Sequence, residues 1–336
     1  MELFELTRRL IELESITGNE RQVGEFVYAR LGELAARHKG KAEKMPVEAE
    51  RFNVFASWDE PVVTLSTHLD TVPPFINFSE DETRIWGRGS CDAKGILAAM
   101  LTAAAGLLAE GVRRFGLLFV VGEEKNSAGA LAAARQPRGS RFLVNGEPTG
   151  NKLALGSKGA LRFEITASGK MAHSAYPELG ESAIEKLLDA LSAIRAIRLP
   201  SDPLLGPSTL NIGTISGGHA PNVVADQASA EIMFRVVGSP EPLREAVARA
   251  VEGRASAREV LYIPPVKLGH LPGFDTTVVA FTSDIPAFGG AWGKPFMLGP
   301  GSIHVAHTEQ EHVLKSELVA AVGLYQKIVR QLLAAC

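Results

Sequence analysis

The feature that most constrains the fold is an apolar strand that stops at a histidine and an aspartate. Residues 62–70 read Val-Val-Thr-Leu-Ser-Thr-His-Leu-Asp, and such a β-branched run is typical of a buried strand. In open parallel sheets, ligands bind just beyond the carboxyl ends of the strands, which is where His68 and Asp70 fall. A histidine nitrogen is a natural zinc ligand, and a nearby carboxylate can hold the other ring nitrogen. The pair indicates a metal site, although a polar strand end without a function would look the same.

Two further apolar runs end in a similar way. Residues 115–121 lead into Glu123 and Glu124, and residues 141–145 lead into Glu147. A doubly wound α/β sheet gathers the carboxyl ends of its parallel strands at one edge. We therefore expect these acids to meet the histidine at a single edge of one sheet.

The composition is that of an ordinary globular protein. The chain has 336 residues, of which 46% are hydrophobic and 22% charged, so about two domains are expected. The net charge of −3 provides no basic surface for nucleic acid and no polybasic membrane anchor. The two cysteines, Cys91 and Cys336, are too few for a disulfide framework and favour a reducing compartment.

Neither a membrane span nor a signal peptide is expected. The uncharged residues 96–109 form a stretch too short to cross a bilayer. Glutamates interrupt the apolar positions near the N-terminus, which a signal peptide would not tolerate. The sequence therefore predicts a cytoplasmic protein without nucleic-acid or membrane partners.

A glycine-rich loop precedes that alanine-rich stretch. Residues 86–95 read Trp-Gly-Arg-Gly-Ser-Cys-Asp-Ala-Lys-Gly, and this spacing matches neither the Walker nor the Rossmann pattern. Asp92 in this loop can act as a helix N-cap. Because the acids on the strand ends need a partner, we also count Asp92 as a candidate metal ligand.

The middle of the chain changes character after Glu147. Half-solvated strands are expected near 161–167, 209–215, 228–236 and 259–263, with helices near 182–198 and 242–251. Strand, helix, two strands, helix and strand is the order of a ferredoxin-like α+β unit. We predict that residues 158–263 form this domain and that it is inserted into a first domain made of residues 1–157 and 264–336.

The candidate ligands form a nitrogen and oxygen set that suits zinc, cobalt or manganese. The set consists of His68, Asp92, Glu123, Glu124, Glu147 and one of His304, His307 or His312. It contains too many acids for one catalytic zinc, whereas two ions bridged by a carboxylate would use them all. Because Glu123 and Glu124 are adjacent, one can bind metal while the other acts as general base.

Five segments together resemble one family of two-zinc hydrolases. They are His-x-Asp at 68–70, Gly-Arg-Gly-Ser-Cys-Asp-Ala-Lys-Gly at 87–95, Gly-Glu-Glu at 122–124, Gly-Glu-Pro-Thr at 146–149 and Gly-Pro-Gly-Ser-x-x-x-Ala-His at 299–307. In kind and in order, these segments are similar to those of the aminoacylase, acetylornithine deacetylase, succinyl-diaminopimelate desuccinylase and glutamate carboxypeptidase family. The last segment is closest to the acetylornithine deacetylases. The resemblance implies a zinc-peptidase-like catalytic domain with a mixed, largely parallel sheet.

The resemblance also implies a role for each residue of the metal site. Asp92 would bridge two metal ions, most often zinc. One ion would bind His68 and Glu147, and the other would bind Glu124 and His307. Asp70 would orient His68, Glu123 would be the general base, and the Asp92–Ala93 peptide would be cis.

The inserted domain resembles the lid and dimerisation domain of the same family. Residues 169–177 read Gly-Lys-Met-Ala-His-Ser-Ala-Tyr-Pro, and by resemblance His173 would hold the oxyanion, often across a homodimer interface. Asn222 would bind near the scissile amide, and Arg235 would bind a substrate carboxylate. Phe234 stands where relatives commonly have aspartate, which leaves the orientation of Arg235 open.

The reaction implied is hydrolysis of an amide next to a free carboxylate. An N-acyl amino acid, such as acetylornithine or acetylcitrulline, is the first substrate class expected. A dipeptidase or carboxypeptidase of the same family is the alternative, because it would use the same metals. A two-metal phosphoesterase would need additional cations for phosphate, and an inactive binding protein would be expected to lack a ligand or Glu123.

Overall fold

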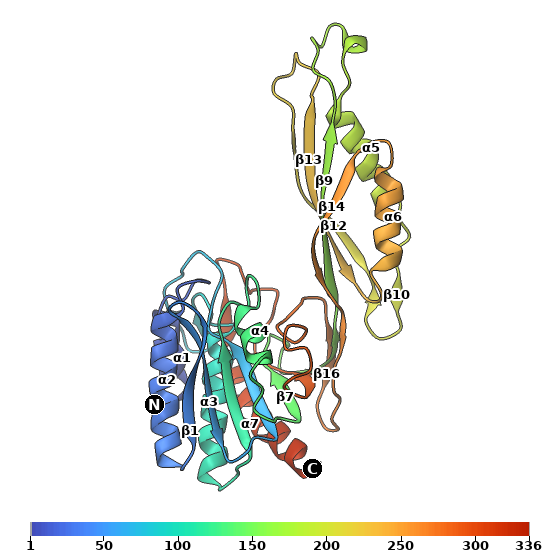
Figure 1. Ribbon diagram of the computed structural model, residues 1–336. Coiled ribbons are helices and arrows are strands. Elements are labelled where there is room, and N and C mark those ends of the chain that lie inside the picture. The colour runs from blue at the N-terminus through green and yellow to red at the C-terminus, as the bar shows by residue number, and fades with distance from the viewer. Residues whose placement is uncertain (1, 336) are drawn as a thin grey trace. The chain divides into compact units, whose positions relative to one another are not determined.

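The structure is a computed structural model that describes residues 2–335, and it divides into two compact units (Figure 1). The first unit contains the residues up to Leu155, Leu268–Thr277 and the residues from Ser283 onward. The second unit contains Gly156–Lys267 and Val278–Thr282. Cys336 lies outside the described residues, and Cys91 is buried as a free thiol.

The first unit is built on a mixed, largely parallel sheet, as predicted. Its strand order is β1 (Lys41–Glu48), β2 (Arg51–Trp58), β6 (Phe115–Val120), β3 (Val63–His68), β7 (Phe142–Asn145) and β17 (Lys294–Met297). The last four strands are mutually parallel, whereas β2 is antiparallel to both of its neighbours, β6 and β1. The apolar runs of the sequence are the central strands, because both faces of β3 and β6 are buried.

Helices on one face and a shorter helix on the other bury this sheet. The larger core joins the sheet to α1 (Leu3–Glu12), α2 (Arg21–Arg37), α3 (Lys94–Ala109) and α7 (Lys315–Ala334). On the other face, α4 (Ala128–Ala134) and the turn ending at Trp292 cover Leu118 and Val120. Helix α3 packs closely at the sheet edge, since a Cβ on Gly146 would lie only 2.4 Å from Ile96. Among residues 2–335, each helix is too short or too polar to cross a lipid bilayer.

The strand register brings the carboxyl ends of three strands to one edge. His68 pairs with Val120, two residues before Gly122, and Ser66 pairs with Asn145, two residues before Glu147. The segments carrying His68, Glu123 and Glu147 therefore leave the sheet side by side.

The second unit is the predicted ferredoxin-like domain. Its elements follow the order β9 (Gly159–Ser168), α5 (Ala183–Arg195), β12 (Thr209–Gly217), β13 (Gln227–Val236), α6 (Glu241–Val251) and β14 (Ser256–Ile263). The sheet order β12-β13-β9-β14 is antiparallel throughout, and both helices bury one face of it. Helix α5 begins at Ser182, whose hydroxyl accepts a hydrogen bond from the Glu185 N–H at 3.2 Å.

Several elements were not predicted from the sequence. Strand β1 carries charged residues and Pro46, which suits a solvated edge strand but obscures the pattern. Helix α4 has seven residues and follows Ser127, which has a left-handed backbone (φ 53°). The other short elements are β4 (Ser79–Glu80), β5 (Arg84–Trp86), β8 (Leu153–Ser157), η1 (Pro177–Leu179), β10 (Ser201–Asp202), β11 (Gly206–Pro207), β15 (Val266–Lys267), β16 (Thr276–Val279) and β18 (His312–Leu314).

Separate cores predict that the two units respond separately to core mutations. Phe234 in the second core and Phe119 in the first are both fully buried. Truncation of either to alanine should cost about 3–5 kcal/mol in its own unit. In calorimetry, Phe234→Ala should lower the melting temperature of the second unit and leave that of the first unit unchanged. Phe119→Ala should do the reverse. A single transition lowered equally by both variants would mean that the units unfold as one.

Candidate metal centre

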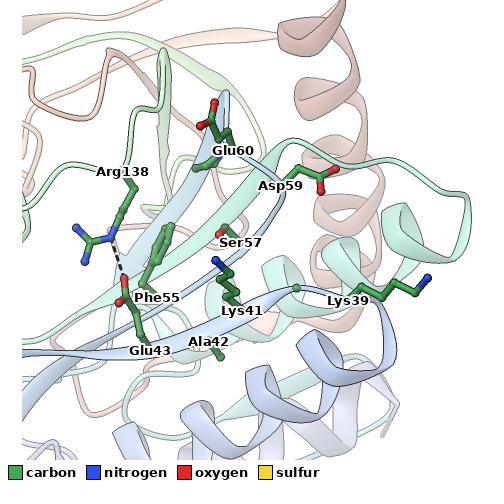
Figure 2. Close-up of a pocket in the computed structure, with 11 residues that line it drawn as sticks. Lys39, Lys41, Ala42, Glu43, Phe55, Ser57, Asp59, Glu60 and Arg138 are labelled. Carbon is green, nitrogen blue, oxygen red and sulfur yellow. Dashed lines mark hydrogen bonds and ion pairs between the residues drawn. The ribbon is translucent and has the colours of Figure 1, made fainter.

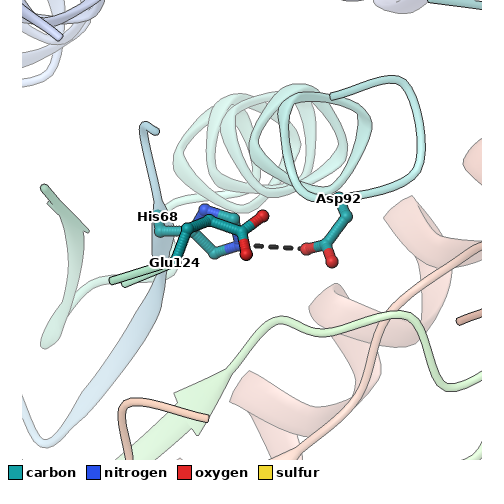
Figure 3. Close-up of side chains that lie close together, drawn as sticks. All are labelled: His68, Asp92 and Glu124. Carbon is teal, nitrogen blue, oxygen red and sulfur yellow. Dashed lines mark hydrogen bonds and ion pairs between the residues drawn. The ribbon is translucent and has the colours of Figure 1, made fainter. Parts of the chain in front are cut away.

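His68 and Asp92 form the centre of a buried polar cluster (Figure 3). His68 Nε2 lies 2.9 Å from Asp92 Oδ1, and both residues are at most 5% exposed. His68 Nδ1 lies 2.9 Å from the backbone carbonyl oxygen of Asp70. Because a carbonyl only accepts, Nδ1 carries a proton in the neutral ring and Nε2 is left to bind a cation. Ligand atoms of His68, Asp92 and Glu124 all lie within 4.8 Å of one another.

The Asp70 carboxylate fixes the two glutamates rather than contacting the imidazole closely. It accepts hydrogen bonds from the backbone N–H groups of Glu123 and Glu124 at 3.1 and 3.2 Å. The Thr17 hydroxyl donates a third at 2.8 Å. The distance from His68 Nδ1 to the Asp70 carboxylate is longer, at 3.6 Å. Asp70 therefore orients His68 through its carbonyl and the two glutamates through its carboxylate.

A second histidine lies on the other side of Asp92. His307 Nε2 is 3.0 Å from Glu124 Oε1 and 3.5 Å from Asp92 Oδ2. The two carboxylate oxygens of Asp92 thus face different imidazoles, as a bridging ligand requires. Of the other two candidates, His304 is exposed, and the His312 ring lies tilted against Trp86, 5.9 Å between centroids.

The cluster holds more buried carboxylates than its own cations can balance. Burial and then the neighbouring Glu147 raise the pKa of Glu123 well above its ordinary value. Burial and then Asp92 do the same to the pKa of Glu147, which is held by a 3.0 Å hydrogen bond from the Asn145 amide. Burial also raises the pKa of Asp92, but hydrogen bonds from His307 and His68 outweigh it and lower that pKa. Divalent ions would relieve this crowding, so the residues present fit a metal centre.

Sequence reasoning missed two buried acids next to this cluster. Glu311 is 1% exposed and hydrogen-bonds the loop that carries Asp92. Asp284 is also 1% exposed, and neither of its carboxylate oxygens makes a well-formed hydrogen bond within the described chain. Burial raises the pKa of Asp284 to about 7, although the nearby Ser127 and His68 act to lower it. The sequence gives little indication that either acid belongs to the site: Glu311 follows His307 by four residues, and Asp284 is not close in sequence to any predicted ligand.

The three predicted lid residues lie in the second unit, at two different places. His173 and Val223 form an isolated β-bridge, and the Ser174 N–H donates to the Asn222 carbonyl at 3.0 Å. His173 and Asn222 are therefore brought together, and both are exposed. Arg235 lies near the other end of β13 and is half-buried, and burial lowers the pKa of its guanidinium.

The first unit also has a surface hollow that is unrelated to this cluster (Figure 2). It has a volume of about 840 Å³, and its charged lining includes Lys39, Lys41, Glu43 and Arg138. Arg138 and Glu43 pair at 2.8 Å. Pro61 in its wall precedes β3, whereas His68 ends β3, so the hollow lies toward the amino end of that strand.

The raised acid pKa values predict an inverse pH dependence of stability in the metal-free protein. Between the unfolded pKa of an aspartate, near 4, and the folded value for Asp284 of about 7, the folded state holds a proton that the unfolded state has lost. Stability therefore falls as pH rises through this window, by up to about 1.4 kcal/mol per pH unit for this one group. Urea denaturation of EDTA-treated protein at pH 5, 6 and 7 should show this fall, and Asp284→Asn should reduce its slope.

A control for that experiment is Asp275→Asn, since Asp275 is an exposed aspartate of the same unit. Its slope should match that of the wild type. Equal slopes in wild type and Asp284→Asn would contradict the assigned pKa.

Comparison with known proteins identifies the family. Residues 155–260 match the peptidase dimerisation domain. A peptidase M20 domain-containing protein of Schizosaccharomyces pombe is 38% identical over 335 residues, covering 97% of this chain and 84% of that protein. A probable carboxypeptidase of Aspergillus terreus is 37% identical over 369 residues, covering 96% of this chain and 84% of that protein.

Solved structures agree with the fold. Aminopeptidase PepT from Bacillus cereus superposes with a TM-score of 0.81 at 20% identity, covering 98% of both chains. The YXEP protein of Bacillus subtilis, described as a dinuclear metal-binding peptidase of the M20 family, has a TM-score of 0.69 at 16% identity, covering 97% of this chain and 96% of that one. The cis Asp92–Ala93 peptide expected from the family resemblance is also present. With more than a third of its residues identical to an M20 relative along nearly its whole length, this chain belongs to the M20 family of metallopeptidases.

Proposed function

We propose that this enzyme is a two-metal peptidase that cleaves the amide bond next to a free terminal carboxylate, as a carboxypeptidase or dipeptidase does. The observation that carries the proposal is the cluster in which the buried Asp92 lies between the buried His68 and the partly exposed His307. A relative 37% identical is named a probable carboxypeptidase, which supports a peptide substrate over an N-acyl amino acid. Similarity of residues 299–307 to acetylornithine deacetylases is the remaining argument for a deacylase.

In this proposal five residues hold the two ions. His68 and Glu147 would hold one, Glu124 and His307 would hold the other, and Asp92 would be shared by both. The donor set of nitrogen and oxygen atoms suits zinc, with cobalt or manganese as alternatives. When bound, such ions lower the pKa of a water ligand and polarise the scissile carbonyl group.

Glu123 is the proposed general base. Its backbone is fixed by the Asp70 carboxylate, 3.1 Å from its N–H, and its side chain shares the buried site with Glu147. Its carboxylate accepts a proton from the attacking water and later donates it to the leaving amine. Its position next to Glu124 keeps the base and one ligand on the same short segment.

The lid residues are proposed to bind the substrate. In the neutral His173 ring, Nδ1 accepts a hydrogen bond from the Ala175 N–H at 3.1 Å, so the proton lies on Nε2. Nε2 can then donate to the oxyanion that forms at the scissile carbonyl. Arg235 is half-buried on the open face of the lid sheet, where a guanidinium gains from a carboxylate partner.

A substrate panel tests the reaction class. N-blocked dipeptides with a free C-terminus should be hydrolysed in a metal-dependent way, with release of the C-terminal amino acid. Amidation of that terminus should lower kcat/KM by about 10–100-fold, because charge-assisted hydrogen bonds are worth about 1.5–3 kcal/mol. Acetylornithine, acetylcitrulline and succinyl-diaminopimelate complete the panel. Faster hydrolysis of any of these than of every peptide would favour the deacylase.

Glu123→Gln is the matched catalytic variant for that panel. It should retain both metal ions and lower kcat by about 10²–10⁴, the usual contribution of a general base. Turnover close to wild type would assign the base to another group.

The geometry of the lid supports a homodimer with shared sites. Gln227 begins β13 close to the segment of His173 and Asn222, whereas Arg235 lies eight residues further along the strand. At about 3.3 Å per residue, this separates the two ends by about 26 Å. One small substrate does not span that distance, so His173 and Arg235 of the same chain serve different sites. We therefore propose that residues 158–263 pair two chains and that His173 acts in the site of the partner.

Mixing two inactive variants tests this assignment. After subunit exchange between Glu123→Gln and His173→Ala, half of randomly paired dimers are mixed. If His173 acts across the interface, each mixed dimer has one intact site, and about a quarter of wild-type activity should return. Recovery should be absent if His173 acts within its own chain, and the same holds if the enzyme is an active monomer.

A further inference from the structure

The loop that carries Asp92 depends on one buried carboxylate. Residues 87–92 form turns rather than a helix or strand, so their N–H groups need partners from elsewhere. The backbone N–H groups of Gly89, Cys91 and Asp92 all donate to Glu311 Oε1, at 2.9, 3.2 and 3.1 Å. A single oxygen atom therefore holds the backbone at three positions of this loop, Gly89, Cys91 and Asp92.

The second oxygen of Glu311 has a different partner. Oε2 pairs with the guanidinium of Arg88, and both residues are 1% exposed. Arg88 also donates to the Pro74 carbonyl at 3.2 Å. Burial raises the pKa of Glu311, and the guanidinium of Arg88 acts in the opposite direction by favouring the ionised carboxylate. A charged acceptor makes stronger hydrogen bonds to backbone N–H groups than a neutral one.

Glu311 also lies on the segment that carries His307. The Glu311 carbonyl accepts a hydrogen bond from the Gly87 N–H at 3.2 Å, and His312 pairs with Trp86 where β18 meets β5. Backbone and side chain of Glu311 therefore tie the segment after His307 to the loop that ends at Asp92. These are the two segments whose side chains approach each other at the metal centre, with His307 Nε2 3.5 Å from Asp92 Oδ2.

We infer that Glu311 is a positioning residue for the metal centre, which sets the distance between the bridging Asp92 and the ligand His307. The inference rests on the proposed two-metal site. The ion shared by Asp92, Glu124 and His307 depends on Glu311 through two of its ligands, Asp92 and His307, whereas the other ion depends on it through Asp92 alone. Removing the charge of Glu311 should therefore lower the binding affinity of the ion at Glu124 and His307 more than that of the ion at His68 and Glu147. Mutation of such supporting groups commonly costs 10–100-fold in metal affinity.

Cobalt(II) titration of the full-length, metal-stripped enzyme tests this. Glu311→Gln keeps the size of the side chain, but it loses the charge and presents an amide N–H₂ to Arg88. Its second cobalt ion should bind 10–100-fold more weakly than in wild type, with an altered d–d absorption spectrum. The matched control is Glu309→Gln, the same change at an exposed position two residues away. Its affinities and spectrum should equal those of the wild type.

The spectrum separates positioning from mere stabilisation of the fold. A role confined to stability would lower the Tm of Glu311→Gln but leave its cobalt affinities and spectrum unchanged below that temperature. That result would overturn the inference. Glu311→Asp serves as a second variant, because it keeps the charge and withdraws the carboxylate by one methylene. It should show the same selective loss of the second ion, and wild-type affinities in this folded variant would equally overturn the inference.

The wild-type titration distinguishes this inference from the proposed function. Two cobalt ions in wild type and in Glu311→Gln with equal affinities would refute only the role of Glu311. A wild-type enzyme that binds no second ion would refute the two-metal site, and the inference with it.

Discussion

The structure depends on the burial of like charges at one edge of the first sheet. Asp92, Glu123, Glu124 and Glu147 converge where β3, β6 and β7 end, and the imidazoles of His68 and His307 lie among them. Buried carboxylates at such distances are stable only when protons or cations neutralise them. The strands, the Asp92 loop and the segment of His307 therefore form a site in which cations must balance the charge of the carboxylates. This requirement, more than any single hydrogen bond, explains why so many separate segments meet there.

The sequence predicted the parts of this arrangement that are encoded locally. An apolar run followed by an acid is visible within ten residues, so the strands before His68, Glu123 and Glu147 were predicted correctly. The ferredoxin-like order of the second unit was visible for the same reason, because its strands alternate and its helices are amphipathic. Strand β1 was not predicted, because its lysines and Pro46, which suit an edge strand, interrupt the apolar alternation expected of a strand.

The rest could not be predicted because it depends on contacts between distant parts of the chain. Three histidines between residues 304 and 312 look equivalent in the sequence, and the family resemblance was needed to select His307. Glu311 binds the N–H of Gly89, which is 222 positions away, and a single glutamate gives no sign of that burial. Asp284 lies between β16 and β17, outside any helix or strand, so no periodic pattern in the sequence indicates its burial. The substrate class, too, depends on individual lid side chains rather than on a pattern, and here the relatives favour the carboxypeptidase that was the alternative reading of the motifs.

The hydrogen bonds of the Asp70 carboxylate constrain how such an enzyme can evolve. Its two oxygens hold the backbone of Glu123 and Glu124, a proposed base and a proposed ligand, through adjacent peptide groups. A substitution that moves one of these glutamates therefore also moves the other. The catalytic groups are accordingly difficult to alter by single substitutions. Arg235, Asn222 and His173 belong to a unit with its own core, where side chains can be exchanged without disturbing that pair. New substrates are accordingly more accessible to this architecture than new reactions.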